Sequence, residues 1–371
     1  MLAPLHKSIK FFYMCTNQRY PLHCILPPYM SDKLDEIFGD DSESRTGEEF
    51  REKRKEQQEE IPAITREIDL EAKPVNKKLI REVCDSKETS ADPGDTIWKE
   101  GDKTTGLSKD AKNVITGAGH VWNFYKKLFN RNSIDNKGMS IIQTIGYRER
   151  RDRPFFNAFW DGKQMYYGTG SPKFTNSFTT DLDIIGHELS HGVIDYEAKL
   201  NYRNQSGALN ESFADVFGIL IKQWANKTGA RKSDWLIGKN ILIRKNALRS
   251  MKAPGKAYRN DPVFGDDPQP AVMKDYMKMP NTEDDDYGGV HYNSGITNHA
   301  FYITSFELNG SAWAKAGAIW YAALLDKELL KQTAKFQDAA DATLRKAVLL
   351  FGKGSLAEKA VQKGWKETGV I

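Results

Sequence analysis

The sequence predicts an α+β protein with a β-rich N-terminal lobe, an α-helical C-terminal lobe, and a helix carrying two histidines at their junction. The first observation behind this is that residues 139–147 and 157–168 have strand-like character. The second is that apolar residues recur at helical spacing in 110–130, 312–330 and 335–351. With 371 residues and 39% hydrophobic content, the chain is long enough for two lobes and an N-terminal extension.

The overall charge excludes two classes of partner. A net charge of +4 arises from 54 basic and 50 acidic residues, which is too balanced for a nucleic-acid-binding or anionic-membrane-binding protein. No apolar run is long enough to span a membrane, and the N-terminus lacks the layout of a secretory signal. We therefore expect a cytoplasmic protein, or one exported without a cleaved signal peptide.

Cysteine usage agrees with a reducing compartment. Cys15, Cys24 and Cys84 are the three cysteines of the chain. They are odd in number and widely spaced, which argues against a framework of disulfide bonds.

The N-terminal third of the chain contains regions of different amino-acid composition. Residues 1–40 form an aromatic and proline-containing block, and residues 40–60 are almost all charged or polar, as in a solvated linker. Short strands are predicted around 64–70. In the helix predicted over 110–130, we interpret His120 as structural, because it lies among apolar positions.

The strongest local signal for chemistry is the stretch 183–191. If this stretch is helical, His187 and His191 lie one turn apart on one face and can hold a single divalent metal ion. Glu188 can then reach a water in the open coordination position and act as general base. The alternative is a charged helix whose two histidines are simply solvated.

A third ligand is predicted downstream, in the stretch 207–218. We expect Glu211 to open a second apolar helix and complete a two-histidine, one-glutamate zinc centre. Asp215, one turn later, and Asn210 are candidates for orienting the ligand imidazoles. Taken singly, Glu211 also fits a helix N-terminus where its charge complements the helix dipole.

An ordered set of motifs resembles one family. The stretches 157–160, 187–193, 207–218, 248–251 and 288–295, the last with His291 after a Gly-Gly turn, resemble the thermolysin family of zinc metalloendopeptidases from about residue 112 to the C-terminus. The stretches 27–30 and 251–270 point to its protealysin-like subgroup. The resemblance implies the two-lobed thermolysin-like fold, one catalytic Zn²⁺ and neutral endopeptidase activity.

The resemblance also implies roles for residues outside the metal site. Tyr202 and His291 are expected to stabilise the oxyanion, and Asp286 is expected to orient His291. Arg249 is expected to support Glu211 and to donate a hydrogen bond to a substrate carbonyl.

Substrate binding is expected at an edge strand and an apolar pocket. By resemblance, Asn157 and Ala158 belong to the strand that binds a peptide backbone by strand addition. Ile184, Leu248 and Phe178 are expected to line a pocket for a bulky hydrophobic residue that follows the scissile bond.

The protealysin-like subgroup implies a precursor. Residues 1–55 would be a propeptide with its charged cleavage linker, followed by catalytic lobes at 56–190 and 191–371. The expected partners are peptide or protein substrates and the chain's own propeptide as intramolecular inhibitor, in a monomer. Cys24, near the propeptide's proline pair, offers a thiolate that could displace the zinc-bound water. The alternative is that Cys24 is a small core residue and the propeptide blocks the cleft sterically.

The sequence departs from the family pattern in several places. The segment 148–154 is longer and more basic, and Phe156 stands where the family often has a polar residue, which predicts altered subsite preference. Tyr287 and Tyr292 are bulkier than usual, which predicts altered access near the oxyanion. A paired calcium site beside the zinc helices is predicted to be absent. Asp183 and Asp234 match its acidic ligands, but Lys222, Leu236 and Lys239 replace the others.

Two alternatives compete with an active endopeptidase. One is a catalytically silent interaction protein whose N-terminal block occupies the cleft permanently. The other is a zinc aminopeptidase, which lacks support because no Gly-x-Met-Glu-Asn signature precedes the histidine helix.

Overall fold

The computed structural model describes residues 23–38, 78–148, 154–244, 246–282 and 284–371. The predicted charged linker at 40–60, the predicted strands at 64–70 and most of the basic segment 148–154 lie outside these ranges. So does most of the N-terminal block at 1–40.

The β-rich lobe is built on a mixed sheet of six strands in the order β1-β5-β6-β4-β2-β3. The strands β6, β4 and β2 run parallel, and the remaining pairs are antiparallel. Their bounds are β1 His23–Cys24, β2 Arg81–Thr89, β3 Asp95–Lys99, β4 Ile141–Tyr147, β5 Ala158–Trp160 and β6 Met165–Tyr167. The strands predicted within 139–147 and 157–168 are confirmed, the second as the β5–β6 hairpin. The edge strand β1 comes from the N-terminal segment, more than 130 residues before its partner β5.

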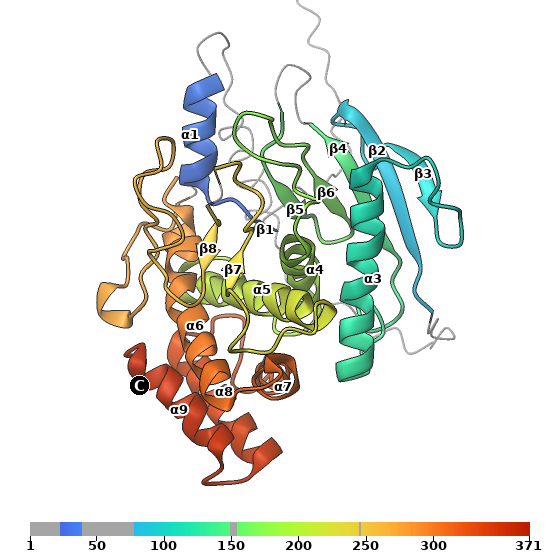
Figure 1. Cartoon of the computed structure of the whole chain (residues 1–371). Helices are drawn as coiled ribbons and strands as arrows, with labels where there is room; N and C mark the ends of the chain where they lie inside the picture. Colours follow the sequence, from blue (N-terminus) through green and yellow to red (C-terminus); the bar gives the residue numbers. More distant parts are fainter. Residues whose placement is uncertain (1–22, 39–77, 149–153, 245, 283) are drawn as a thin grey trace, which may run out of the picture.

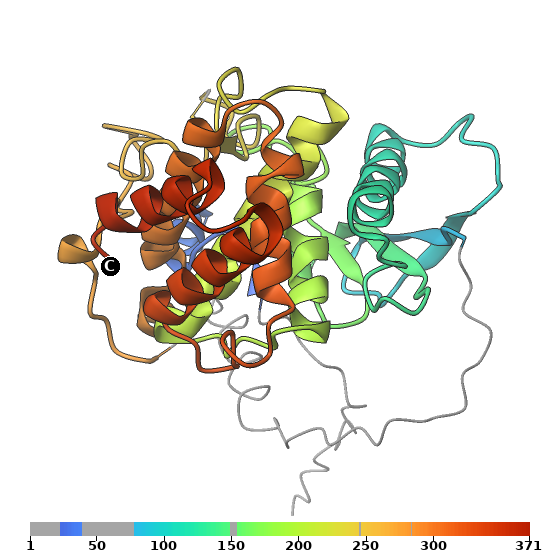
Figure 2. The same cartoon turned by 90° about the horizontal axis from the view of Figure 1, so that it is seen from below.

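The other regular elements of the described fold are helices and a small two-stranded sheet of β7 (Leu236–Ile237) and β8 (Arg249–Ser250). The helices are α1 Pro28–Phe38, α3 Lys109–Phe129, α4 Leu182–Tyr196, α5 Asn204–Ala225, η1 Met273–Asp275, α6 Asp286–Leu308, η2 Ala312–Ala314, α7 Ala316–Leu324, α8 Phe336–Phe351 and α9 Leu356–Glu367. Figure 1 shows α4 and α5 in the middle of the molecule, with the sheet and α3 to one side and α6 to α9 to the other. Seen from below, the same division into two lobes is plain (Figure 2).

Helix α3 illustrates how local sequence sets the elements. The Ser108 side chain accepts a hydrogen bond from the Ala111 amide at its start, and Asn130 ends it in the left-handed conformation. The imidazole of His120 in this helix lies edge-on to the Trp224 ring, with ring centroids 6.5 Å apart, in keeping with the structural role predicted for His120. Burial lowers the pKa of this imidazole, which favours its neutral form.

Two predicted helix boundaries were wrong. The helix expected over 312–330 is a short 3₁₀ turn followed by α7, which ends at Leu324. The Asp326 side chain accepts hydrogen bonds from the Glu328 and Leu329 amides and so forms a turn instead of a further helical turn. Likewise, Glu211 does not open α5, because that helix begins at Asn204, two turns earlier.

The histidine helix α4 is buried along most of its length and packs closely on α5. Glycines make this approach possible. A Cβ on Gly218 of α5 would lie 2.5 Å from the Asp183 carbonyl oxygen and 3.1 Å from the His187 amide nitrogen, both backbone atoms of α4. A Cβ on Gly186 would meet the Gly218 Cα at 3.1 Å. Because backbone atoms cannot move independently, a side chain here would push the two helices apart.

Gly218→Ala is therefore expected to destabilise the protein by about 1–3 kcal/mol through overpacking, despite alanine's better helix propensity. It is also expected to weaken zinc binding, because it displaces the backbone of His187. Thermal melts and a zinc competition titration measure the two effects. Gly119→Ala is the matched control, since a Cβ there meets only the flexible end of Arg81. Equal behaviour of the two variants would contradict the packing argument.

Candidate metal centre and peptide cleft

Helices α4 and α5 bring the three predicted metal ligands together. The Nε2 atoms of His187 and His191 are 2.9 Å apart, and each lies 3.5 Å from one oxygen of the Glu211 carboxylate. In a tetrahedral zinc site, ligand atoms are spaced by about 3.3 Å. All three side chains are buried, and Glu211 Oε2 has no hydrogen-bond partner among the residues that the structure describes. This donor set therefore fits a divalent cation such as zinc.

Two further side chains set the orientation of the histidine rings. His187 Nδ1 lies 2.8 Å from Asp215 Oδ1, and His191 Nδ1 lies 2.9 Å from Asn210 Oδ1. Because each oxygen accepts a hydrogen bond from Nδ1–H, the lone pair of each ring is left on Nε2, which faces the centre. The structure thus places Asp215 and Asn210 where the sequence predicted them.

Arg249 contacts a different partner from the one predicted. It was expected to support Glu211, but its Nε and Nη2 atoms donate to the two oxygens of Asp215 at 2.9 and 2.8 Å. Burial alone would raise the pKa of Asp215, but Arg249 and His187 together hold it well below its ordinary value. Arg249 therefore acts on the metal site through the carboxylate behind His187, a preference that reflects the bidentate geometry of guanidinium and carboxylate.

The sequence analysis missed Asn298 of α6. Its Nδ2 donates to Asp215 Oδ2 at 2.9 Å, and its Oδ1 accepts from Ser212 at 2.9 Å. Asn298 follows His291 by seven residues, and this two-turn spacing on one helix face is the signal that could have indicated it.

Glu188 is fully buried, and neither of its carboxylate oxygens makes a well-formed hydrogen bond in the described part of the chain, although the Trp160 backbone lies close enough to act on its pKa as a donor. Burial, followed by the nearby charge of Glu211, raises the pKa of Glu188 well above its ordinary value. A carboxylate with an elevated pKa holds a proton more readily than an exposed one, as a general base requires.

Tyr202 and His291 meet on the other side of Glu211. The Tyr202 hydroxyl donates to Glu211 Oε1 and lies 3.3 Å from His291 Nε2. His291 Nδ1 contacts Asp286 Oδ1 at 2.6 Å, and the His291 amide donates to Asp286 Oδ2. Burial alone would lower the pKa of His291, but Asp286 and Glu211 raise it, which favours an imidazolium that donates from both nitrogens.

The predicted Gly-Gly turn before His291 is present at the start of α6. Tyr287, Gly288 and Gly289 all have positive φ. A Cβ on Gly288 would lie 2.3 Å from Asn204 Oδ1 at the start of α5. The turn thus needs glycine for both its backbone conformation and its close packing.

The N-terminal segment passes through this site as strand β1 followed by a bend at residues 25–26. The Ile25 amide donates to the Ala158 carbonyl at 3.3 Å, and the Leu26 amide donates to Asn157 Oδ1 at 3.0 Å. His291 Nε2 donates to the Cys24 carbonyl at 2.9 Å, and Arg249 Nη1 donates to the Ile25 carbonyl at 2.8 Å. Residues 24–26 therefore make backbone contacts with Asn157, Ala158, His291 and Arg249, four of the residues predicted to bind a peptide or its oxyanion.

The thiolate switch suggested for Cys24 is wrong in this structure. The Cys24 side chain lies in a cluster with Tyr147, Phe155, Phe159 and Tyr166, and its Sγ is 3.4 Å from the Leu26 carbonyl oxygen. Alternation along a strand explains this, because successive side chains point to opposite faces. The residue before it, His23, faces the metal ligands instead.

The apolar side chains expected to form a specificity pocket are all in the core. Ile184, Leu248 and Phe178 are buried, and they share one apolar cluster with Ile25 and Leu26 of the N-terminal segment. Among the bulky departures, Tyr292 packs against Tyr29 of α1 with ring centroids 5.1 Å apart. Phe156 and Tyr287 are buried.

An ion pair lies at the position of the paired calcium site that was predicted to be absent. Lys222 Nζ donates to the buried Asp183 carboxylate at 2.8 Å and to the Leu236 carbonyl at 3.0 Å, and it is 3.7 Å from Asp234. Lys239 donates to Asp234 at 3.0 Å. Burial raises the pKa of Asp183 to about 6, against the lowering effect of Lys222. The Asp183 charge thus depends on the ammonium group beside it.

Comparison with known proteins decides the family. The chain is 41% identical over 353 residues to Protease PrtS of Photorhabdus sp. (strain Az29), covering 93% of this chain and 91% of that protein. The chain belongs to the thermolysin family of metallopeptidases. Family profiles for the thermolysin metallopeptidase catalytic domain and α-helical domain match residues 51–195 and 198–370.

Other relatives of the thermolysin family agree. The extracellular metalloprotease of Pectobacterium carotovorum subsp. carotovorum is 41% identical over 294 residues, covering 78% of this chain and 81% of that protein. The solved precursor of protealysin, a metalloproteinase from Serratia proteamaculans, matches with a TM-score of 0.78 and 37% identity, covering 94% of this chain and 100% of that chain.

Membership of the thermolysin family confirms the predicted two-lobed α+β fold and the prediction of a zinc metalloprotease, since this family uses a catalytic zinc. The likeness to a protealysin precursor confirms the predicted subgroup. Within the part of the chain that the structure describes, no helix is long and apolar enough to cross a membrane.

Lys222→Ala is expected to lower the free energy of unfolding by about 3 kcal/mol, because it leaves the buried Asp183 carboxylate without its counter-charge. Lys239→Ala is the matched control. Its half-exposed pair with Asp234 should contribute less than about 1 kcal/mol. Denaturant unfolding of the two variants measures this difference. The wild-type melting temperature should be the same with calcium and with a calcium-selective chelator, and a large rise with calcium would contradict the ion-pair interpretation.

Proposed function

We propose that this protein is a zinc-dependent neutral endopeptidase made as an autoinhibited precursor, which cleaves peptide bonds on the N-terminal side of bulky hydrophobic residues. One observation carries the proposal. Residues 24–26 of the chain's own N-terminal segment contact Asn157, Ala158, His291 and Arg249 through their backbone atoms. A cleft that binds a peptide through its backbone accepts varied sequences, as an endopeptidase must.

The metal would be held by His187, His191 and Glu211, with Asp215 and Asn210 orienting the two imidazoles. Zinc bound there would supply a water of lowered pKa and polarise the substrate carbonyl. Glu188, buried beside the ligands, would take a proton from the attacking water and pass it to the leaving amine.

The remaining groups would bind the substrate and the charge that develops on it. Tyr202 and His291 would donate hydrogen bonds to the oxyanion, and Asp286 would keep His291 charged and oriented. Arg249 would hold the next carbonyl of the substrate. In the precursor, His291 and Arg249 donate to carbonyls of the N-terminal segment, which supports inhibition by occupancy.

The precursor organisation is part of the proposal. Residues 1–55 would be the propeptide and its linker, cut within 40–60, and the catalytic lobes would span 56–190 and 191–371. We further propose a monomer that acts on peptides or proteins and lacks the paired calcium site, because Lys222 lies against Asp183. A cytoplasmic location, or export without a cleaved signal peptide, stays a prediction.

The decisive experiment incubates the purified full-length chain with zinc or with a chelator and follows both its N-terminal processing and casein cleavage.

Glu188→Gln should keep one zinc per chain yet lose at least about 100-fold in activity, because the proton acceptor is gone while the ligands remain. Glu211→Ala should instead lose zinc, since it removes one of three protein ligands. A wild-type chain that binds zinc but cleaves neither itself nor casein would favour the silent interaction protein.

Substrate preference gives a second prediction. Peptides with leucine, isoleucine or phenylalanine after the scissile bond should be cleaved about 10- to 100-fold faster than matched peptides with alanine or an acid there, since burying such a side chain contributes roughly 1.5–3 kcal/mol. The buried Ile25, whose carbonyl Arg249 holds, motivates this choice. A peptide library that selects acidic residues at this position would refute it.

A further inference from the structure

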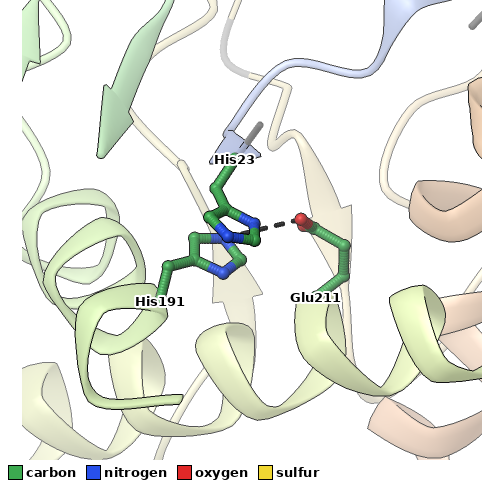
Figure 3. A group of neighbouring side chains, drawn as sticks. All are labelled: His23, His191 and Glu211. Atoms are coloured by element: carbon green, nitrogen blue, oxygen red, sulfur yellow. Dashed lines mark ion pairs between the residues drawn. The ribbon is translucent and has the colours of Figure 1, made fainter. Parts of the chain in front are cut away.

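His23 of the N-terminal segment lies directly on the metal ligands. Figure 3 shows its imidazole descending from β1 over the ring of His191, with the Glu211 carboxylate facing both. The two rings are nearly parallel at 13°, with centroids 4.4 Å apart. One ligand atom from each of His23, His191 and Glu211 lies within 4.8 Å of the others, and all three residues are buried. A cation held by His191 and Glu211 would therefore have the His23 imidazole nearby, and a tilt of that ring out of its stack on His191 would turn an in-plane nitrogen lone pair toward the same ion.

The two nitrogens of His23 have different surroundings. Nε2 lies 3.4 Å from Asp195 Oδ1, an ion-pair distance, whereas the buried Nδ1 has no hydrogen-bond partner among the described residues. The side chain is buried to more than nine-tenths, so an unpaired nitrogen there is costly unless another atom binds it. His187 shows the same pattern, with one nitrogen on a carboxylate and the other facing the metal site. This is the usual arrangement of an imidazole that binds a metal.

The backbone beside His23 is bound as a substrate would be, and a metal-binding role for His23 would explain how this segment resists cleavage. The Cys24 carbonyl accepts a hydrogen bond from His291, and the Ile25 carbonyl accepts one from Arg249. The Ile25 amide donates to Ala158. In the mechanism proposed above, these contacts make Cys24–Ile25 the bond that would be cut. Hydrolysis would add water across this bond and release a Cys24 carboxylate and an Ile25 amine.

We propose that His23 is a ligand of the zinc ion in the precursor, joining His187, His191 and Glu211 through the nitrogen that Asp195 does not contact. This inference rests on the proposed function and deepens it. His23 takes the coordination position that the attacking water needs, so the segment binds in the manner of a substrate and is not cut. Release of the N-terminal segment removes His23 and opens that position.

The test uses the full-length chain loaded with zinc, in a Glu188→Gln background that prevents cleavage during the measurement. X-ray absorption spectroscopy counts the imidazole ligands. We expect three in the precursor, and two with an added oxygen ligand in His23→Phe, which keeps an aromatic ring over His191. Cys24→Ala, in the same strand but facing away from the metal, is the matched control and should keep three. Zinc transfer to a chelator should be at least tenfold faster from His23→Phe than from the precursor with His23 or from its Cys24→Ala variant.

A second readout follows the peptide bond itself. With Glu188 restored, mass spectrometry should find His23→Phe cut between Cys24 and Ile25, while the wild type and Cys24→Ala stay intact at that bond. Two imidazoles in the wild-type precursor, together with unchanged zinc transfer, would overturn the role of His23. Casein cleavage by the processed enzyme would then leave the proposed function standing. A precursor that binds no zinc at all would overturn both.

Discussion

The contact between α4 and α5 is the constraint on which the site depends. Two histidines on one helix supply only half of a metal site, and the third ligand has to come from a second helix held at close range. Gly186 and Gly218 allow the two backbones to approach until side chains on α5 reach both imidazoles of α4. The cost is a set of polar and charged groups buried between the lobes. Each is tolerated because its neighbours satisfy it, or because a cation would.

The buried carboxylate of Asp215 shows how this cost is met. Its two oxygens accept hydrogen bonds from His187 of α4, from two nitrogens of Arg249 in β8 and from Asn298 of α6. Four donors from two helices and one strand therefore converge on one carboxylate. A fully paired anion in a low-dielectric interior holds its partners in fixed orientations. The position of His187 therefore depends on elements from α5, β8 and α6 together.

How much of the site could be predicted from the sequence depends on how far apart in the chain the interacting residues lie. The spacing of His187 and His191 specifies one helix face, and the Gly-Gly turn before His291 has a conformational cause, so local pattern was enough for both. Glu211 was predicted to begin its helix, whereas it lies about two turns inside α5. Gly207 lies inside this helix, where a Cβ would be 2.4 Å from the Val290 side chain and is excluded by packing. The pairing of Arg249 with Asp215 and the position of His23 join residues far apart in the chain, and periodicity carries no information on such pairs.

Arg249 has a consequence that reaches beyond its hydrogen bonds. One guanidinium holds both the carboxylate that orients His187 and the carbonyl of the peptide in the cleft. Two binding equilibria that share a group in this way are linked, and thermodynamic linkage is reciprocal. Whatever free energy a bound peptide adds to metal affinity, the metal must add to peptide affinity. The precursor and its metal would then stabilise each other, so that depletion of the cation loosens the N-terminal segment as well.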